Sequence, residues 1–352
     1  MWASGYYGYL SDYLLLWAIW VSLVAHAWCF FRLFPRHKRH KLSLVVGNAL
    51  VACCLAGFAG MIAESYLRFV STATDAYGAT LTCRRWHVAY APTNSLGHRD
   101  LEWSEAKPLG VKRVAFVGDS FTYGWGINRP EDRFSNLIQT RFEAVDPGSV
   151  EVMNVAWRGW DARAQVAGIE RMIREYGADE VVLCYVPNDI EGVLPTRPDF
   201  DPKKPPQSTW LRTDCSFLLD YLYYRVYAPR VAQVAGYCDW LAEGFLNEST
   251  WKEHQADLGR IIALCREHQV PLRVALLPFL QTTGTKFQAG GIHAMLTEFF
   301  RRNEVPVVDL RPCIQGYMPK DLAVNAHDYH PNELANRLFA DCIWKAFFVG
   351  SR

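Results

Sequence analysis

Two long segments without a charged side chain lie near the start of the chain, and they limit its fold more than any other feature. They run from Tyr13 to Phe31 and from Leu42 to Ala63, about 19 and 22 positions, and about 20 apolar residues in a helix suffice to cross a bilayer. A buried helix of a soluble domain is the alternative for each. Two apolar segments of this length, one after the other and joined by a basic loop, favour helices that span a membrane. We expect transmembrane helices at about 13–34 and 42–64.

The connector between these segments, residues 35–41 (PRHKRHK), carries four Lys or Arg residues. Short loops rich in these residues stay in the cytoplasm, so both termini and the rest of the chain are expected outside it. The first 12 residues hold no Lys or Arg, unlike a cleaved signal peptide. The sequence predicts a two-pass protein of the inner (plasma) membrane with a periplasmic domain. A net charge of +1 gives no indication of a nucleic-acid partner.

After Lys112 the sequence alternates between short β-branched runs and amphipathic stretches, a pattern typical of a parallel sheet covered by helices. We expect strands at 113–117, 150–155, 180–186, 272–277 and 305–310. Helices are expected at about 133–145, 162–176, 252–268, 293–302 and 332–347. The fold class is therefore α/β, with a five-stranded parallel sheet in a three-layer domain at 112–352. Residues 69–111 are expected to form a linker along the domain's edge.

One connection, about 191–250, is too long for a crossover loop. Its first part, Pro195 to Pro206, is rich in Pro, Asp and Lys and predicts an exposed loop. Its second part, Phe217 to Leu246, predicts one or two helices. This insertion could close over the site as a lid, or pack as a helical element on the side of the domain. We expect disulfides in an oxidising compartment among six cysteines, namely Cys83, Cys215, Cys238, Cys265, Cys313 and Cys342. Cys215 with Cys238 is the favoured pair, because the two bracket the helical part.

Polar residues and glycines follow three of the expected strands, at the edge where parallel sheets bind ligands. A serine there can act as a nucleophile if a base and an oxyanion site lie nearby. Pro331 suits the first turn of the last helix, and a His–Asp pair directly precedes it. Each feature alone has a plain structural explanation as turn chemistry. The candidates are Asp119, Ser120, Gly159, Asn188, Asp328 and His330.

Together, these signals resemble the four sequence blocks of the SGNH (GDSL-type) hydrolase superfamily. The blocks are residues 118–120 (G-D-S), Gly159 in N-x-A-x-x-G, Asn188 in P-N-D, and Asp328 with His330 in D-x-H-P-N. The resemblance covers roughly Lys107 to the C-terminus and implies a flavodoxin-like sheet. The commoner spacing puts the Asp three residues before the His, a position held here by His327. The two-residue spacing resembles that of the alginate-acetylation members.

The resemblance implies that Ser120 is the nucleophile and His330 its base, with Asp328 orienting the imidazole. The oxyanion would be bound by the backbone N–H groups of Ser120 and Gly159 and by the Asn188 side chain, with Asp119 in a supporting role. Ester chemistry of this type needs no metal and no organic cofactor.

Two functions remain open on the sequence. The first is a membrane-anchored serine esterase or acyltransferase that acts on O-acyl (acetyl) esters of an envelope glycan or lipid. The second is a non-catalytic subunit of the same fold that caps a larger membrane complex, with a transmembrane protein as partner. The complete set of blocks favours the enzyme, although fold alone does not imply function.

Overall fold

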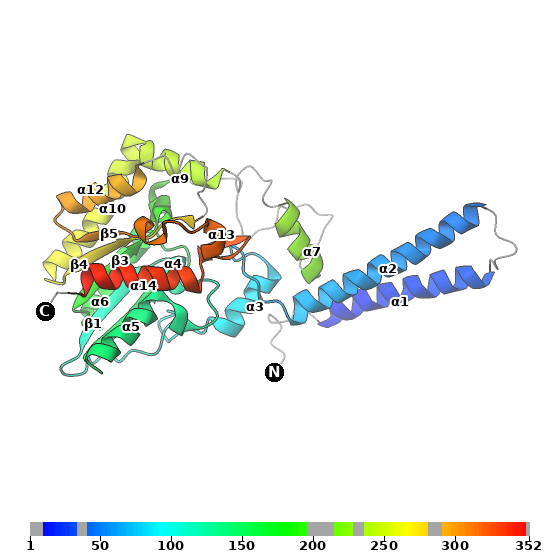
Figure 1. Ribbon diagram of the computed structural model, residues 1–352, viewed down its shortest axis with the longest axis horizontal. Helices are drawn as coiled ribbons and strands as arrows, with labels where there is room; N and C mark the ends of the chain where they lie inside the picture. Colours follow the sequence, from blue (N-terminus) through cyan, green and yellow to red (C-terminus); the bar gives the residue numbers. More distant parts are fainter. Residues whose placement is uncertain (1–9, 34–40, 196–214, 228–235, 281–290, 350–352) are drawn as a thin grey trace. The chain divides into compact units, whose positions relative to one another are not determined.

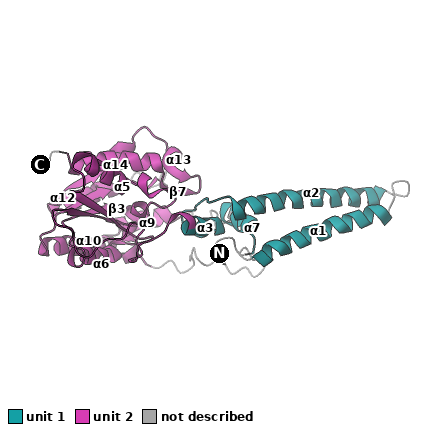
Figure 2. Cartoon of the chain, turned by 90° about the horizontal axis from the view of Figure 1, so that it is seen from below, with its two compact units in different colours: residues 1–88, 201–231 teal, residues 89–200, 232–352 magenta. Residues whose placement is uncertain are grey.

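The computed structural model describes residues 10–33, 41–195, 215–227, 236–280 and 291–349. The chain divides into two compact units (Figure 2). Unit 1 comprises Met1–Val88 and Asp201–Val231, and unit 2 comprises Ala89–Phe200 and Ala232–Arg352. The expected basic connector at 35–41 and the expected exposed loop at 195–206 lie almost wholly outside the described residues.

Unit 2 is built on a five-stranded parallel sheet of order β2-β1-β3-β4-β5 (Figure 1), the flavodoxin-like order. This confirms the expected fold class. The strands are β1 (Lys112–Gly118), β2 (Val150–Ala156), β3 (Glu180–Tyr185), β4 (Leu272–Leu276) and β5 (Val307–Asp309).

Five long helices cover the sheet, each within a few residues of its expected position. They are α5 (Phe134–Val145), α6 (Ala162–Arg174), α10 (Glu248–Glu267), α12 (Ile292–Arg302) and α14 (Glu333–Phe347). The shorter elements are α3 (Leu81–Tyr90), α4 (Ser120–Tyr123), η2 (Pro130–Asp132), η3 (Pro187–Val193), α9 (Tyr237–Leu246), η7 (Arg311–Ile314), α13 (Pro319–Leu322), β6 (Ala323–Asn325) and β7 (Asp328–Pro331).

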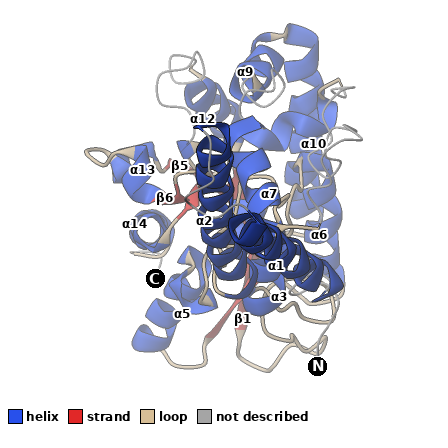
Figure 3. Cartoon of the chain, turned by 90° about the vertical axis from the view of Figure 1, so that its right-hand side faces the viewer, coloured by secondary structure: helices blue, strands red, loops and turns tan. Residues whose placement is uncertain are grey.

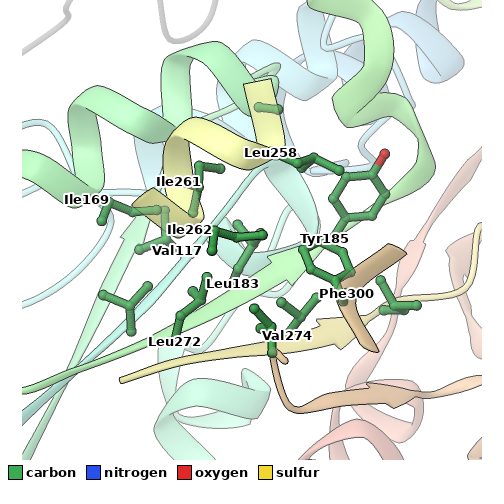
Figure 4. Packing of buried hydrophobic residues seen from close by; sticks show 14 of the residues in the cluster. Val117, Ile169, Leu183, Tyr185, Leu258, Ile261, Ile262, Leu272, Val274 and Phe300 are labelled. Carbon is green, nitrogen blue, oxygen red and sulfur yellow. The ribbon is translucent and has the colours of Figure 1, made fainter. Parts of the chain in front are cut away.

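Alternate residues of the central strands pack on opposite faces of the sheet, because side chains along a strand point to the two sides in turn. On β3, Val181 and Leu183 join α6, α10 and α12 in one core cluster, which Figure 4 shows at close range. Val182 and Cys184 join α5 and α14 in the other. Both faces of the sheet are therefore covered, and Figure 3 shows strands between the two helix layers.

Unit 1 contains the two long apolar helices, α1 (Leu10–Leu33) and α2 (Lys41–Phe69), each of a length and composition that could cross a membrane. At 1.5 Å per residue they are about 36 and 43 Å long, which exceeds the roughly 30 Å hydrocarbon core of a bilayer. Trp20 of α1 donates its indole N–H to the Cys54 carbonyl at 3.0 Å. A side chain at Gly57 would lie 2.7 Å from Trp20, so glycine allows this close packing.

Part of the long insertion packs on α2. Helix α7 (Phe217–Leu222) continues into a π-helical turn, η4 (Tyr223–Tyr227). The Ser216 hydroxyl donates to Glu64 at 2.7 Å, and the Leu218 backbone N–H donates to the same carboxylate at 2.8 Å. Glu64 also accepts a bond from Arg68 at 2.8 Å, and both side chains are buried. The first helix of the insertion is thus fixed to the second apolar helix, whereas α9 packs against α10 and η3 within unit 2.

The expected Cys215–Cys238 disulfide is wrong, because both residues are free cysteines. The disulfide joins Cys313 of η7 to Cys342 of α14, with their Cα atoms 6.4 Å apart. Bracketing a helical segment in the sequence does not bring two thiols together. Cys313 and Cys342 come together because η7 and α14 pack on each other.

Candidate active site

Ser120 lies where β1 meets the short helix α4, at the carboxyl edge of the sheet. Asp119 caps α4 by accepting a hydrogen bond from the Phe121 N–H at 2.9 Å. A Cβ atom at Gly118 would lie 2.2 Å from the Thr122 hydroxyl and 2.9 Å from the Cys184 carbonyl. Only glycine therefore fits this turn, and the turn presents Ser120 at the first position of the helix, where its N–H has no intrahelical partner.

Asp328 and His330 come from the antiparallel hairpin of β6 and β7, directly before α14. They are two residues apart on β7, so their side chains share one face of the strand. His327 lies in the exposed turn between β6 and β7, where its N–H donates to the Asn325 side chain at 2.9 Å. The two-residue spacing thus places a carboxylate beside His330 without any contribution from His327.

Ser120, His330 and Asp328 form one hydrogen-bonded chain. The distance from Ser120 Oγ to His330 Nε2 is 2.8 Å, and that from His330 Nδ1 to Asp328 Oδ1 is 2.5 Å. Because a carboxylate only accepts, we assign the imidazole proton to Nδ1, which leaves Nε2 to accept from the serine. Asp328 is fully buried and His330 nearly so. A base held in this way can remove the proton of the serine hydroxyl.

Asn188 lies on η3, which follows β3 and so reaches the same sheet edge. Its side-chain amide donates to Asp119 Oδ2 at 3.0 Å. Burial raises the pKa of Asp119, and the hydrogen bond from Asn188 is the largest of the opposing effects. Burial, and then the negative charge of Asp119, raises the pKa of the neighbouring Asp189 well above its usual range. An amide has two N–H bonds, so Asn188 keeps one for a ligand.

Gly159 lies in the exposed loop after β2, the strand next to β1. Its φ of +69° belongs to the left-handed region that favours glycine. Nothing lies within 4 Å of a Cβ added there, so backbone conformation and not space requires the glycine. Its N–H meets no hydrogen-bond acceptor in the described part of the chain. The structure therefore brings every residue of the four sequence blocks to one edge of the sheet.

The sequence profile of the GDSL-like Lipase/Acylhydrolase family matches residues 116–338. The chain belongs to this family. It is thus an ester hydrolase of the SGNH/GDSL type, as the sequence blocks predicted.

The chain is also similar, at low identity, to solved structures of esterases. An esterase, EstA from Pseudoalteromonas sp., is 12% identical, with 67% of this chain and 96% of that chain covered and a TM-score of 0.41. Axe2, an acetylxylan esterase from Geobacillus stearothermophilus, is 16% identical, with 68% and 95% covered and a TM-score of 0.42. No curated protein matches the chain.

Aromatic rings flank the histidine of this GDSL-type site, and the sequence analysis did not single them out. The ring centroids of Phe121 and Trp125 lie 5.2 and 6.1 Å from that of His330. Phe121 stacks in turn on Phe279, with centroids 6.1 Å apart. The position of Phe121, one residue after the serine, is the signal that would have pointed to it.

Arg99 supports the turn that follows α4, and it was also missed. Its guanidinium donates to the carbonyls of Gly124 at 2.7 Å and Ile127 at 2.6 Å. Burial, and then the charge of Arg133, lowers the pKa of Arg99 to about 9. Nearby, Asp100 accepts the Asn154 N–H at 2.7 Å. The segment around Arg99 is thus hydrogen-bonded both to edge strand β2 and to the turn that follows α4.

Proposed function

We propose that the protein is a membrane-anchored serine esterase or acyltransferase that acts on O-acyl, in particular acetyl, esters of an envelope glycan or lipid. The observation that carries the proposal is the hydrogen-bonded chain from Ser120 through His330 to Asp328. Membership of the GDSL-like family supports ester chemistry. We further propose that the acyl group is acetyl and that a glycan or a lipid of the envelope carries it. Transfer of this group to a second hydroxyl is proposed as the alternative to hydrolysis.

The first half of the reaction forms an acyl-enzyme. Ser120 Oγ attacks the ester carbonyl carbon while its proton passes to His330 Nε2. Asp328 stabilises the imidazolium through the Nδ1–H bond and itself stays ionised. As the tetrahedral intermediate collapses, the bond to the alkoxy oxygen breaks and His330 gives that oxygen the proton. Water, or a hydroxyl of an acceptor, then attacks the acyl carbon and gives its proton to His330. The bond from that carbon to Ser120 Oγ breaks, and His330 returns the proton to the serine.

The negative charge on the carbonyl oxygen needs hydrogen-bond donors at this edge of the sheet. We assign this role to the N–H groups of Ser120 and Gly159 and to the free N–H of the Asn188 side chain. Asp119 holds that side chain by accepting its other N–H. One such donor typically lowers the barrier by about 3–4 kcal/mol.

A serine-reactive fluorophosphonate tests the enzyme directly. The full chain in detergent should be labelled at Ser120, and Ser120→Ala should not be labelled. Absence of labelling in protein with a normal circular-dichroism spectrum would contradict the proposal. It would favour the alternative, a non-catalytic subunit that caps a membrane complex with a transmembrane partner.

The length and composition of α1 and α2 are compatible with a membrane anchor, and the basic residues at 35–41 support a cytoplasmic connector. Unit 2 would then lie in the periplasm. A single cysteine introduced at position 38, in a background without native thiols, should resist an impermeant maleimide in intact cells and react after lysis. Ready labelling in intact cells would overturn this orientation.

A further inference from the structure

Arg158 lies in the loop after β2, directly before Gly159, and its side chain is exposed. Its guanidinium carbon lies 4.9 Å from the ring centroid of Trp125. Trp125 is only 3% exposed, and its ring lies 6.1 Å from that of His330. The cation is therefore held on a buried indole that itself flanks the proposed catalytic base.

The exposed arginines of the neighbouring helix α6 form ion pairs with carboxylates. Arg163 bonds to Glu253 and Asp257, Arg171 bonds to Glu175, and Arg174 bonds to Glu170. Within the described ranges, Arg158 makes no ion pair and no hydrogen bond, and its guanidinium contacts the Trp125 ring. Stacking on an indole face leaves the N–H edge of a guanidinium open to solvent.

Further positive charge lies close to the same turn. Burial raises the pKa of Tyr123, and the positive charges of Arg99, Arg158 and Arg133, in this order, oppose the rise. Three guanidinium groups therefore act on a residue three positions after Ser120. Asp100, a buried carboxylate in the same segment as Arg99, faces Arg133 at 3.5 Å, and Arg158 forms no ion pair in the described part of the chain.

We propose that Arg158 determines substrate specificity by binding an oxyanion group, a carboxylate or a phosphate, that the substrate carries beside its scissile ester. This inference rests on the esterase function proposed above and narrows its substrates to anionic ones. The planar guanidinium matches both kinds of oxyanion through two parallel N–H bonds. Because Trp125 already restrains the side chain, binding costs less conformational entropy than for a free surface arginine.

Two matched pairs of acetyl esters test the proposal on the full chain in detergent. The carboxylate pair is 4-acetoxybenzoate and its neutral methyl ester, and the phosphate pair is 1-acetylglycerol 3-phosphate and monoacetin. The variants are Arg158→Gln, Arg158→Lys, and the control Arg174→Gln, which removes an exposed charge from the last residue of α6. The readout is the ratio of kcat/KM for the anionic and neutral members of each pair.

We expect Arg158→Gln to lower that ratio about tenfold at low salt for the favoured oxyanion, with little change for the neutral ester. Arg158→Lys should retain part of the preference, Arg174→Gln all of it, and added salt should weaken it in the parent. The pair that shows the larger loss identifies carboxylate or phosphate. Equal loss for charged and neutral esters would mean that Arg158 only covers Trp125, and it would overturn the proposal.

A binding measurement separates this inference from the esterase function. In the Ser120→Ala protein, saturation-transfer NMR should detect the two anionic esters, and Arg158→Gln should weaken their binding about tenfold. Arg158-dependent binding without turnover by the parent would overturn the esterase and support the anion site. Turnover with binding that is independent of Arg158 would overturn the anion site and leave the esterase intact.

Discussion

Asp119 Oδ2 accepts a hydrogen bond from the side-chain amide of Asn188 at 3.0 Å. The bond joins the turn after β1 to the 3₁₀ helix after β3, 69 residues away in the chain. Asp119 also caps α4 through the Phe121 N–H. One buried carboxylate thus fixes both the helix that carries the serine and a proposed oxyanion donor.

Asn188→Ala should lower kcat by about 10²- to 10³-fold with little change in KM, because the lost donor acts on the charge that develops in the transition state. Asp119→Ala should also lower kcat, since the amide is no longer held, and should destabilise the domain by about 1 kcal/mol through the lost cap. Steady-state kinetics on a short-chain ester and a thermal melt separate the two effects. An unchanged kcat in Asn188→Ala would remove Asn188 from the oxyanion site.

His330→Ala should abolish nearly all ester turnover, because it removes the base that lies 2.8 Å from the Ser120 hydroxyl and takes its proton. Asp328→Asn should lower turnover by no more than His330→Ala does, since Asp328 orients the imidazole and stabilises its cation without transferring the proton. His327→Ala is the matched control, and its exposed position predicts little effect. Circular dichroism must show each variant folded. The opposite ranking, with His327 essential, would mean that the hairpin register is different.

Glu191 gives a pH-dependent contribution to stability. Burial raises its pKa from 4.5 to about 7, although Tyr237 donates a hydrogen bond to it. The folded state therefore binds this proton more tightly than the unfolded state. The resulting contribution to the free energy of unfolding is fully present below pH 4.5 and is lost as the pH rises through 7. Glu191→Gln keeps an acceptor for Tyr237. The free energy of unfolding of Glu191→Gln, minus that of the parent, should rise by on the order of 2 kcal/mol between pH 5 and pH 8.

Melts of both proteins at the two pH values measure this difference. Glu175→Gln, at the exposed residue directly after α6, is the matched control for the loss of a carboxylate. A difference that is the same at pH 5 and pH 8 would contradict a raised pKa at Glu191.

Glu64→Ala should release α7 from α2. The change leaves Arg68 buried without its carboxylate and the Leu218 N–H without its acceptor, and breaking a buried pair in this way typically costs about 3–5 kcal/mol. Ser216→Ala removes the helix cap and one of the hydrogen bonds to Glu64 but leaves the Glu64–Arg68 pair in place, so it should cost less, about 1–2 kcal/mol. Hydrogen exchange of the amides at 217–222 reads out both. Protection in Glu64→Ala equal to that in the parent would show that Glu64 does not hold the helix.

The sheet could be predicted because each strand carries a local signal. Residues 114–117 and 181–186 are continuous apolar runs of strand length, as expected for strands covered on both faces. The start of α10 was placed four residues late because its cap, Asn247, which accepts the Thr250 N–H at 3.0 Å, was not recognised as a helix start.

The site blocks could also be located, because their residues are fixed by turns at strand ends. Arg99, the Glu64–Ser216 contact and the Cys313–Cys342 disulfide could not. Each depends on which distant segments meet in the folded chain, and no local pattern of polarity or spacing encodes that meeting.

The bond between Glu64 and Ser216 spans 152 positions, and this separation sets an order of events during synthesis. At roughly 5–20 residues per second, the ribosome reaches Ser216 about 8 to 30 s after Glu64. Strands β1, β2 and β3 are made in that interval, while Glu64 has only its neighbour Arg68 as a partner. The contacts of the apolar helix α2 are therefore completed only after more than half of the sheet has been translated.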